Sequence, residues 1–289
     1  MEQARTNPKQ FIERKTWLSL LILAFDWSCI VGLAALSIWA AHPVVYVVCV
    51  WLIGSRQFAI GEVLLHEASH HNLFRQRRLN DWLQFLYGFP VLVDVRHYRE
   101  DHLTHHAHTL VPPDTTIFRY SAHGLAGKPH RMVWLWLVRP VVGYSAVFYL
   151  FFHSSVWPGR TGPGPLHLFW AIVIGIFAWF GALHLLLLYW VVPLFWCFAS
   201  YLYWSEVTEH FNVKKSHSRT NVSRIWNLLH HNLGYHYVHH QYPTIPWYRL
   251  PSAHRALCPP MDELDSTPGL LGTLRQFKDQ PREVSAPAQ

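Results

Sequence analysis

The chain has 289 residues, of which 51% are hydrophobic, 16% are aromatic and only 14% are charged. Soluble globular domains carry nearer to a quarter of charged residues, so this composition argues against an ordinary soluble protein. The formal net charge is +7, but the basic residues flank apolar segments, which is typical of membrane topology and not of nucleic-acid binding. The four cysteines have no CxxC spacing, which argues against a disulfide framework and a thiolate metal site.

The first two apolar runs of the chain predict a helical hairpin. Residues 17–41 are long enough to cross the roughly 30 Å hydrocarbon core of a bilayer. Asp26 interrupts this run, and we expect its side chain to face protein rather than lipid. A second run begins at Val44 and continues to His66, which predicts one long helix whose last turns rise above the bilayer. Basic residues on both flanks place both ends of the pair on the cytoplasmic side.

The middle of the chain contains four further apolar runs. Residues 79–95 are interrupted by glycine and proline, which predicts a partly inserted helix. If the histidine-rich stretches on either side of residues 132–204 share one site, the chain must cross the membrane an even number of times between them. Arg139-Pro140 breaks the run 132–152, so we predict that this run lies along the interface. The runs 166–184 and 185–204 then form a second hairpin.

These elements together predict an all-α integral membrane protein. It has two transmembrane helical hairpins, with about four spans, interfacial helices, and a cytoplasmic helical cap that carries the histidines. Residues 1–16 are expected to form a cytoplasmic N-terminal segment, residues 17–261 the membrane domain, and residues 262–289 a polar, disordered tail.

Histidine is the residue type that points to chemistry. The chain contains 22 histidines, and clustered histidines suggest metal binding. Eight of them fall into three patterned clusters, each just beyond an apolar segment: His66-x-x-x-His70, His102-x-x-His105-His106 and His236-x-x-His239-His240. Spacings of three and four residues bring side chains onto one face of a helix. A catalytic zinc takes only three protein ligands, so eight imidazoles favour two metal ions with open coordination positions.

The first cluster also reads as His66-Glu67-x-x-His70, which is the zinc-protease signature. A membrane zinc metalloprotease is therefore a remote alternative, but it leaves six patterned histidines without a role. A histidine-rich metal transporter is a second alternative, although transporters usually place their ligands within spans.

The three clusters resemble the histidine boxes of the membrane fatty acid desaturase/hydroxylase superfamily, over about residues 40–260. The superfamily pattern is H-x(3–4)-H, H-x(2–3)-H-H and H-x(2–3)-H-H, separated by spanning hairpins. The resemblance implies a non-haem di-iron oxidoreductase that uses O₂ and two electrons to desaturate a fatty-acyl or other hydrophobic chain. The alternative within the superfamily is a hydroxylase or ketolase acting on a lipid, a carotenoid or a small biosynthetic intermediate.

The resemblance also implies roles for residues outside the boxes. His210 is the expected ninth metal ligand, and Glu206, four residues earlier, is expected to face the metal through water. Glu209, Glu67 and Asp101 are expected to accept hydrogen bonds from imidazoles, with Arg56 or Arg96 as an alternative ion-pair partner of Glu67. We expect no catalytic side chain beyond the metal centre. Five other histidines fall outside the boxes and are expected either to contact the ligands from behind or to be structural, namely His71, His97, His108, His230 and His231.

Cofactors, partners and location follow from the same resemblance. We expect two non-haem iron ions, with O₂ as co-substrate. The chain contains no iron–sulfur spacing, no GxGxxG and no fused cytochrome b5 motif, so we expect electrons from a separate ferredoxin- or cytochrome-type donor. The other expected partners are the lipid bilayer and an acyl or other hydrophobic substrate. We expect an integral membrane protein with its histidine boxes on the cytoplasmic side, in the inner membrane if the source is bacterial.

Overall fold

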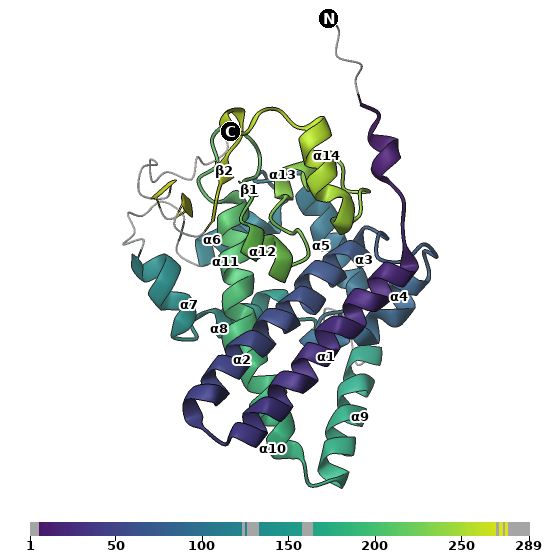
Figure 1. The fold of residues 1–289 in the computed structure, drawn as a ribbon, viewed down its shortest axis with the longest axis vertical. Helices are drawn as coiled ribbons and strands as arrows, with labels where there is room; N and C mark the ends of the chain where they lie inside the picture. The colour runs from purple at the N-terminus through teal and green to yellow at the C-terminus, as the bar shows by residue number, and fades with distance from the viewer. Residues whose placement is uncertain are drawn as a thin grey trace, which may run out of the picture.

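The computed structural model describes residues 6–122, 125, 133–157, 164–269, 272–273 and 275–276. These residues are predominantly helical, which confirms the predicted all-α class, and Figure 1 shows their arrangement. The helices are α1 (Thr16–Ala40), α2 (Pro43–Phe58), α3 (Leu65–Ser69), α4 (Leu79–Trp82), α5 (Val95–Ala107), α6 (Thr115–Ala122), α7 (Arg139–Val141), α8 (Ser145–Phe148), α9 (Pro165–Trp179), α10 (Leu183–Leu186), α11 (Ala199–His210), α12 (Arg224–Leu229), α13 (His236–Gln241) and α14 (Leu250–Leu257). Two short strands, β1 (Thr220–Asn221) and β2 (Ser266–Thr267), pair in parallel.

Three continuous helices are long and apolar enough to cross a membrane, namely Thr16–Ala40, Pro43–Ser69 and Leu183–His210. The second joins α2 to α3 through a π-helical segment, and the third joins α10 to α11 through two such segments. The fourth expected span is shorter than predicted. Helix α9 has 15 residues, which reach about 22 Å at 1.5 Å per residue, because the chain turns at Gly181, where φ is +65°.

The first two spanning helices form the predicted hairpin and lie side by side in Figure 1. The second also packs closely against the third. A Cβ atom placed on Gly54 would lie 2.3 Å from the Cβ atom of Cys197, so only glycine permits this approach of the two backbones. The main hydrophobic core lies where these helices meet and includes the fully buried side chains of Ile53, Phe58 and Phe198.

A buried charged cluster ties the first hairpin to the histidine-rich cap. Asp26 on α1 is fully buried, as predicted, and its carboxylate accepts hydrogen bonds from Arg56 Nη1 at 2.9 Å and from His231 Nε2 at 2.7 Å. The neighbouring His230 lies 3.1 Å from Ser55 Oγ. His231 has φ of +47°, so the chain bends sharply here, five residues before α13 begins at His236.

The two apolar runs expected not to span the membrane are both broken. Residues 79–91 contain α4 and two short 3₁₀ helices. Residues 134–153 contain α7, α8 and two π-helical segments, and Gly143, with φ of +81°, interrupts them. Among the described residues, neither run forms a helix long enough to cross a bilayer.

The start of the predicted disordered tail is ordered, which corrects its boundary at residue 262. Strand β2 pairs with β1, and the buried carboxylate of Asp265 accepts hydrogen bonds from the backbone N–H groups of Lys214, Lys215 and Ser216. A single acidic side chain thus closes the loop that follows α11. The tail from residue 277 onward lies outside the described residues.

Replacement of Asp26 by alanine tests the buried cluster. Removing the carboxylate leaves Arg56 buried without its counter-charge, and breaking a buried ion pair in this way costs about 3–5 kcal/mol. We therefore expect Asp26→Ala to lower the thermal unfolding midpoint of the detergent-solubilised protein markedly. Val31→Ala is the matched control because Val31 lies on the same helix and is 65% exposed. Equal midpoints for the two variants would contradict the structural importance of the cluster.

Candidate metal centre

The first histidine box lies where the second spanning helix emerges into the cap. His66 is in α3 and His70 follows its last residue. The spacing of four residues directs both imidazoles to the same side, and their ring centroids are 5.1 Å apart. His66 is only 4% exposed, and its Nε2 atom is buried without a hydrogen-bond partner among the described residues.

The second box lies on α5, which begins at a well-formed N-cap. The Asp94 side chain accepts hydrogen bonds from the backbone N–H groups of Arg96 and His97. This cap fixes the start of the helix, and His102, His105 and His106 follow two turns later.

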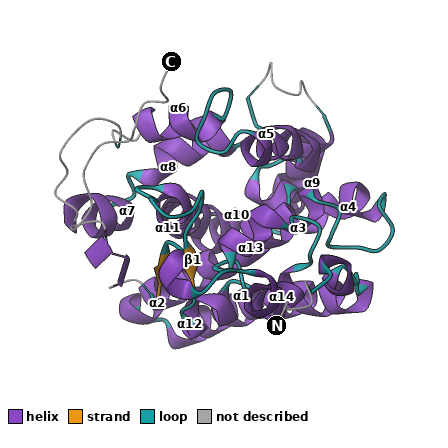
Figure 2. Ribbon diagram, turned by 90° about the horizontal axis from the view of Figure 1, so that it is seen from above, coloured by secondary structure: helices purple, strands orange, loops and turns teal. Residues whose placement is uncertain are grey.

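The third box lies on the short helix α13, and His210 is the last residue of α11. Figure 2 shows α13 between α3 and α11 when the molecule is seen from above. The boxes therefore come from segments far apart in the sequence and meet at the centre of the cap.

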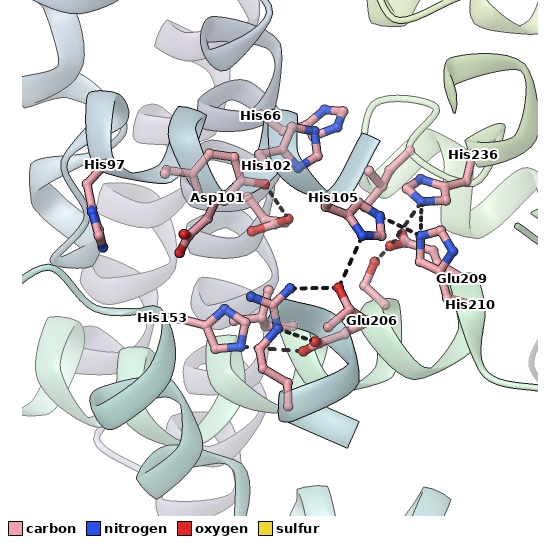
Figure 3. Close-up of a pocket in the computed structure, with 17 residues that line it drawn as sticks. His66, His97, Asp101, His102, His105, His153, Glu206, Glu209, His210 and His236 are labelled. Carbon is pink, nitrogen blue, oxygen red and sulfur yellow. Dashed lines mark hydrogen bonds and ion pairs between the residues drawn. The ribbon is translucent and has the colours of Figure 1, made fainter. Parts of the chain in front are cut away.

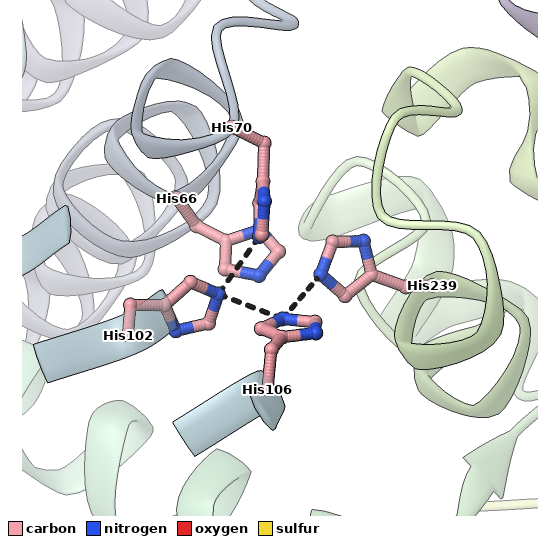
Figure 4. A group of neighbouring side chains, drawn as sticks. All are labelled: His66, His70, His102, His106 and His239. Carbon is pink, nitrogen blue, oxygen red and sulfur yellow. Dashed lines mark hydrogen bonds between the residues drawn. The ribbon is translucent and has the colours of Figure 1, made fainter. Parts of the chain in front are cut away.

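The nine predicted ligands converge in two groups. One group contains five histidines, His66, His70, His102, His106 and His239, which Figure 4 shows pointing toward one another. The other contains four, His105, His210, His236 and His240. Within each group the nitrogen atoms that could bind a metal all lie within 4.8 Å of one another.

Each H-x-x-H-H box is divided between the two groups. In the second box, His102 and His106 belong to the five-histidine group and His105 to the other. In the third box the division is reversed, because His239 joins the five-histidine group and the outer pair does not. On an α-helix, residues four apart differ by about 40° and residues three apart by about 60° in the opposite sense. The two α-helices therefore send their outer pairs to opposite metals.

The spacing of the imidazole nitrogens fits metal ligands better than hydrogen bonds. Six Nε2···Nε2 distances within the two groups are 2.9–3.1 Å. His102 Nε2 has two such neighbours, His70 and His106, and one nitrogen carries at most one hydrogen. Ligands at right angles around an ion with bonds of about 2.1 Å lie about 3.0 Å apart, whereas tetrahedral ligands lie about 3.4 Å apart. The observed nitrogen spacings therefore suit metal ions that bind more than four ligands.

Hydrogen bonds behind the imidazoles leave the Nε2 atoms free to face the metal. The Nδ1–H of His105 donates to Asp114 Oδ2 at 3.0 Å, and the Nδ1–H of His210 donates to the backbone carbonyl of His217 at 3.0 Å. Such contacts fix the ring and its tautomer in metal sites. Burial alone would raise the pKa of Asp114, but hydrogen bonds from His105 and from backbone N–H groups lower it to about 2, so this carboxyl group is an acceptor at neutral pH.

The cap also keeps the imidazoles uncharged. Burial, followed by the neighbouring histidines, lowers the pKa of His102, His236 and His239 well below the usual value. Metal binding requires the neutral imidazole, so the site meets this condition at neutral pH.

Two carboxylates of α11, Glu206 and Glu209, lie in the wall of the site. Glu206 accepts from Arg119 Nε at 2.6 Å and lies 3.4 Å from His153 Nε2. Its contact with a metal ion through water stays a prediction. Glu209 Oε2 lies 3.6 Å from the metal-facing Nε2 of His236, and not at Nδ1, where a group that orients the ring would sit.

Glu67 is buried beside the first box but does not have the ion-pair partners that we predicted. Its Oε2 accepts the backbone N–H of Trp247 at 3.1 Å, and its Oε1 lies 4.0 Å from His66 Nδ1. Arg56 instead pairs with Asp26, which corrects one proposed pairing, and the described ion pairs do not join Arg96 to Glu67. Because Glu67 is not on the Nε2 side of His66, it is not placed to activate a metal-bound water, as a zinc protease requires.

A pocket opens beside both histidine groups, and Figure 3 shows the side chains that line it. Asp101 faces this pocket, without a hydrogen bond to an imidazole among the described residues. Several lining side chains were not expected at the site from the sequence, among them Glu62, Tyr98 and Arg119. Glu62 lies four residues before His66 on the same helix, and this spacing was the signal that could have identified it.

Comparisons with known proteins agree with this site. The sequence model of the family described as fatty acid desaturase matches residues 41–266. The chain is 26% identical to the sn-1 acyl-lipid omega-3 desaturase (ferredoxin) of Synechocystis, over 95% of this chain and 81% of that protein. It is 26% identical to the dihydrorhizobitoxine desaturase of Bradyrhizobium elkanii, over 82% and 74% of the two chains. It is also 26% identical to the chloroplastic sn-2 acyl-lipid omega-3 desaturase (ferredoxin) of Arabidopsis thaliana, over 92% and 67%.

Replacement of His239 by alanine tests the grouping of the histidines. His239 belongs to the five-histidine group, so its loss should weaken one metal site and leave the other intact. We expect the metal content of the purified protein, measured by plasma mass spectrometry, to fall from two ions to about one per chain.

His184→Ala is the control for this measurement because His184 is exposed and lies in α10, at the start of the third spanning helix and far along the chain from the boxes. It should retain both ions. Retention of two ions by His239→Ala, or equal losses in the two variants, would contradict the grouping.

Proposed function

The chain belongs to the fatty acid desaturase family, and we propose that its two histidine groups hold two non-haem iron ions in an O₂-dependent dehydrogenation of an aliphatic chain. The protein is a membrane oxidoreductase of that family. The observation that supports the metal assignment best is the convergence of nine imidazoles into two groups with nitrogen spacings near 3.0 Å. Imidazole binds several transition metals, and the family favours iron among them.

The reaction takes two hydrogens from neighbouring carbons of the substrate. The substrate CH₂–CH₂ unit becomes CH=CH. The two hydrogens removed from it combine with O₂, two electrons and two protons to form two molecules of water. The irons, when bound, supply O₂ activation and the abstraction of hydrogen. The nine histidines are their proposed ligands: His66, His70, His102, His105, His106, His210, His236, His239 and His240.

The remaining side chains of the site hold and enclose the centre. Asp114 and the carbonyl group of His217 hold the rings of His105 and His210 in place. Leu202 and Leu233 line the pocket beside the boxes and limit the access of water. Glu206 accepts a hydrogen bond from Arg119, and both line the pocket; we propose that this pair maintains the shape of the pocket.

The proposed electron donor is a small acidic carrier of the ferredoxin type. Two of the similar proteins carry ferredoxin in their names. Exposed basic residues occur near the cap, and they could attract an acidic protein: Arg75, Arg77, Arg78, Lys214 and Lys215. The basic flanks of the first hairpin support a cytoplasmic position for the cap.

The proposed substrate is a fatty-acyl or other aliphatic chain. The acyl-lipid names of two similar proteins support a lipid. Dihydrorhizobitoxine desaturase is not named for a lipid, so a small biosynthetic intermediate is the alternative substrate. Oxygen insertion by a hydroxylase or ketolase is the alternative reaction at the same centre.

Product analysis with the iron-loaded protein separates these reactions. We expect the detergent-solubilised protein, supplied with reduced ferredoxin, O₂ and a mixture of membrane lipids and their biosynthetic precursors, to give a product two mass units lighter than its substrate. Mass spectrometry of the extract measures this change, and the same incubation under argon is the control. A product heavier by one oxygen atom would contradict the proposed dehydrogenation and favour the hydroxylase or ketolase.

A further inference from the structure

The proposed metal ligand His210 is the last residue of a helix. It ends α11, and the next residue, Phe211, is extended, with φ of −71° and ψ of 129°. The last four carbonyl groups of a helix have no partner within the helix, so the final turn needs hydrogen-bond donors from elsewhere in the fold. The position of His210 therefore depends on what holds the end of α11.

The side chain of Arg219 holds this helix end. Arg219 is only 1% exposed. Its Nη1 atom donates a hydrogen bond to the backbone carbonyl of Thr208, and its Nη2 atom donates to the carbonyl of Phe211 at 3.0 Å. A longer contact of 3.4 Å joins Nη2 to the carbonyl of Asn212. The guanidinium charge thus lies at the C-terminal end of α11, where the helix dipole favours a cation.

The backbone of Arg219 makes a further contact with the same turn. Its N–H group donates to the carbonyl of Glu209 at 2.7 Å. Because the contacted carbonyl groups lie on both sides of His210, Arg219 fixes the backbone segment from which this imidazole projects. These carbonyl groups belong to Thr208, Glu209, Phe211 and Asn212.

The loop that leads to Arg219 also holds the ring of His210. The carbonyl of His217, two residues before Arg219, accepts the Nδ1–H of His210 at 3.0 Å. Earlier in this loop, the carboxylate of Asp265 accepts hydrogen bonds from the backbone N–H groups of residues 214–216. The loop is therefore anchored in its middle and at its end, and it sets both the ring and the backbone of His210.

The guanidinium group of Arg219 is itself held in place. Its Nε atom donates to Gln276 Oε1 at 2.9 Å, and Gln276 Nε2 donates to the carbonyl of Ser266 in β2. Arg219 directly precedes β1, which pairs with β2. All three guanidinium nitrogens, Nε, Nη1 and Nη2, have acceptors in this arrangement. The single ammonium group of a lysine cannot reproduce this use of the planar fork.

Helix α11 contributes a ligand to one histidine group only. His210 belongs to the four-histidine group with His105, His236 and His240, and its Nε2 atom lies 2.9 Å from that of His236. The ligands of the five-histidine group come from α3 and the residue after it, from α5 and from α13. A disturbance at the end of α11 should therefore act on one metal site more than on the other.

We propose that Arg219 is a positioning residue for the metal site of the four-histidine group. It holds the end of α11 so that the Nε2 atom of His210 stays directed at the ion, and it acts through the backbone without touching metal or substrate. This inference rests on the proposed function, because it takes the two histidine groups to be metal sites. Replacing groups that orient metal ligands from behind typically lowers metal affinity by about 10–100-fold.

Metal binding by two single-site variants tests the inference. Replacing His70 and His239 by alanine removes two ligands of the five-histidine group and leaves the four-histidine group complete. Replacing His236 and His240 by alanine does the reverse. Arg219→Gln is then added to each variant, and an absorption titration of the metal-free, detergent-solubilised full chain measures the Kd for Co²⁺, which is next to Fe²⁺ in the order of affinities. We expect Arg219→Gln to weaken Co²⁺ binding about tenfold at the four-histidine group and to leave the five-histidine group unchanged.

Two further variants separate the geometry of Arg219 from its charge and from general effects on the protein. Arg219→Lys keeps the charge but not the fork, so its loss of Co²⁺ affinity at the four-histidine group should be smaller than that of Arg219→Gln. Arg224→Gln is the matched control, because Arg224 is exposed and lies five residues further along the chain. It should leave both affinities unchanged. If Arg219→Gln does not fold, Arg219→Lys decides the result by the same comparison of the two groups.

The outcomes distinguish this inference from the proposed function. Weakening confined to the four-histidine group supports the positioning role, since a general loss of structure would weaken both groups alike. Unchanged affinity at the four-histidine group, or equal weakening at both, overturns the positioning role and leaves the two-metal centre standing. If the unmodified chain binds no Co²⁺, the proposed metal centre fails and this inference fails with it.

Discussion

The constraint on which the rest of the structure depends is the burial of many imidazole nitrogens within a few ångströms of one another. Nitrogens 2.9–3.1 Å apart cannot all be joined by hydrogen bonds, because each imidazole nitrogen carries at most one hydrogen. Bringing them together therefore costs free energy unless metal ions repay it. The fold must hold the three boxes and His210 in position against this cost, and the features that surround the cap serve this purpose.

The spanning helices provide the rigid support. The second carries the first box directly, and the third ends at His210. Close packing at Gly54 fixes one helix against the other. The charged cluster of Asp26, Arg56 and His231 then joins the first hairpin to the chain just before α13, so the membrane region and the third box are linked by buried hydrogen bonds. A charge within a span is expensive, and here it is used to position a distant segment.

Much of this arrangement could be predicted from the sequence, because spacing along a helix determines direction. The three boxes, their resemblance to the desaturase superfamily and the protein-facing Asp26 followed from residue patterns, and the family match confirms the resemblance. The division of the second and third boxes between two groups could not be predicted, since it depends on how α5 and α13 are rotated relative to each other. The partner of Arg56 and the contacts of Glu206 likewise come from segments brought together only by the tertiary fold. The length of α9 was overestimated because Gly181 adopts a positive φ within an apolar run.

The central claim is that nine histidines form two unequal metal sites in one buried centre. Mössbauer spectroscopy of the protein loaded with ⁵⁷Fe tests it most directly, because the iron nucleus reports its own ligand set. Five histidines around one ion and four around the other predict two quadrupole doublets of equal area. A single doublet, or a protein that retains only zinc, would contradict the account.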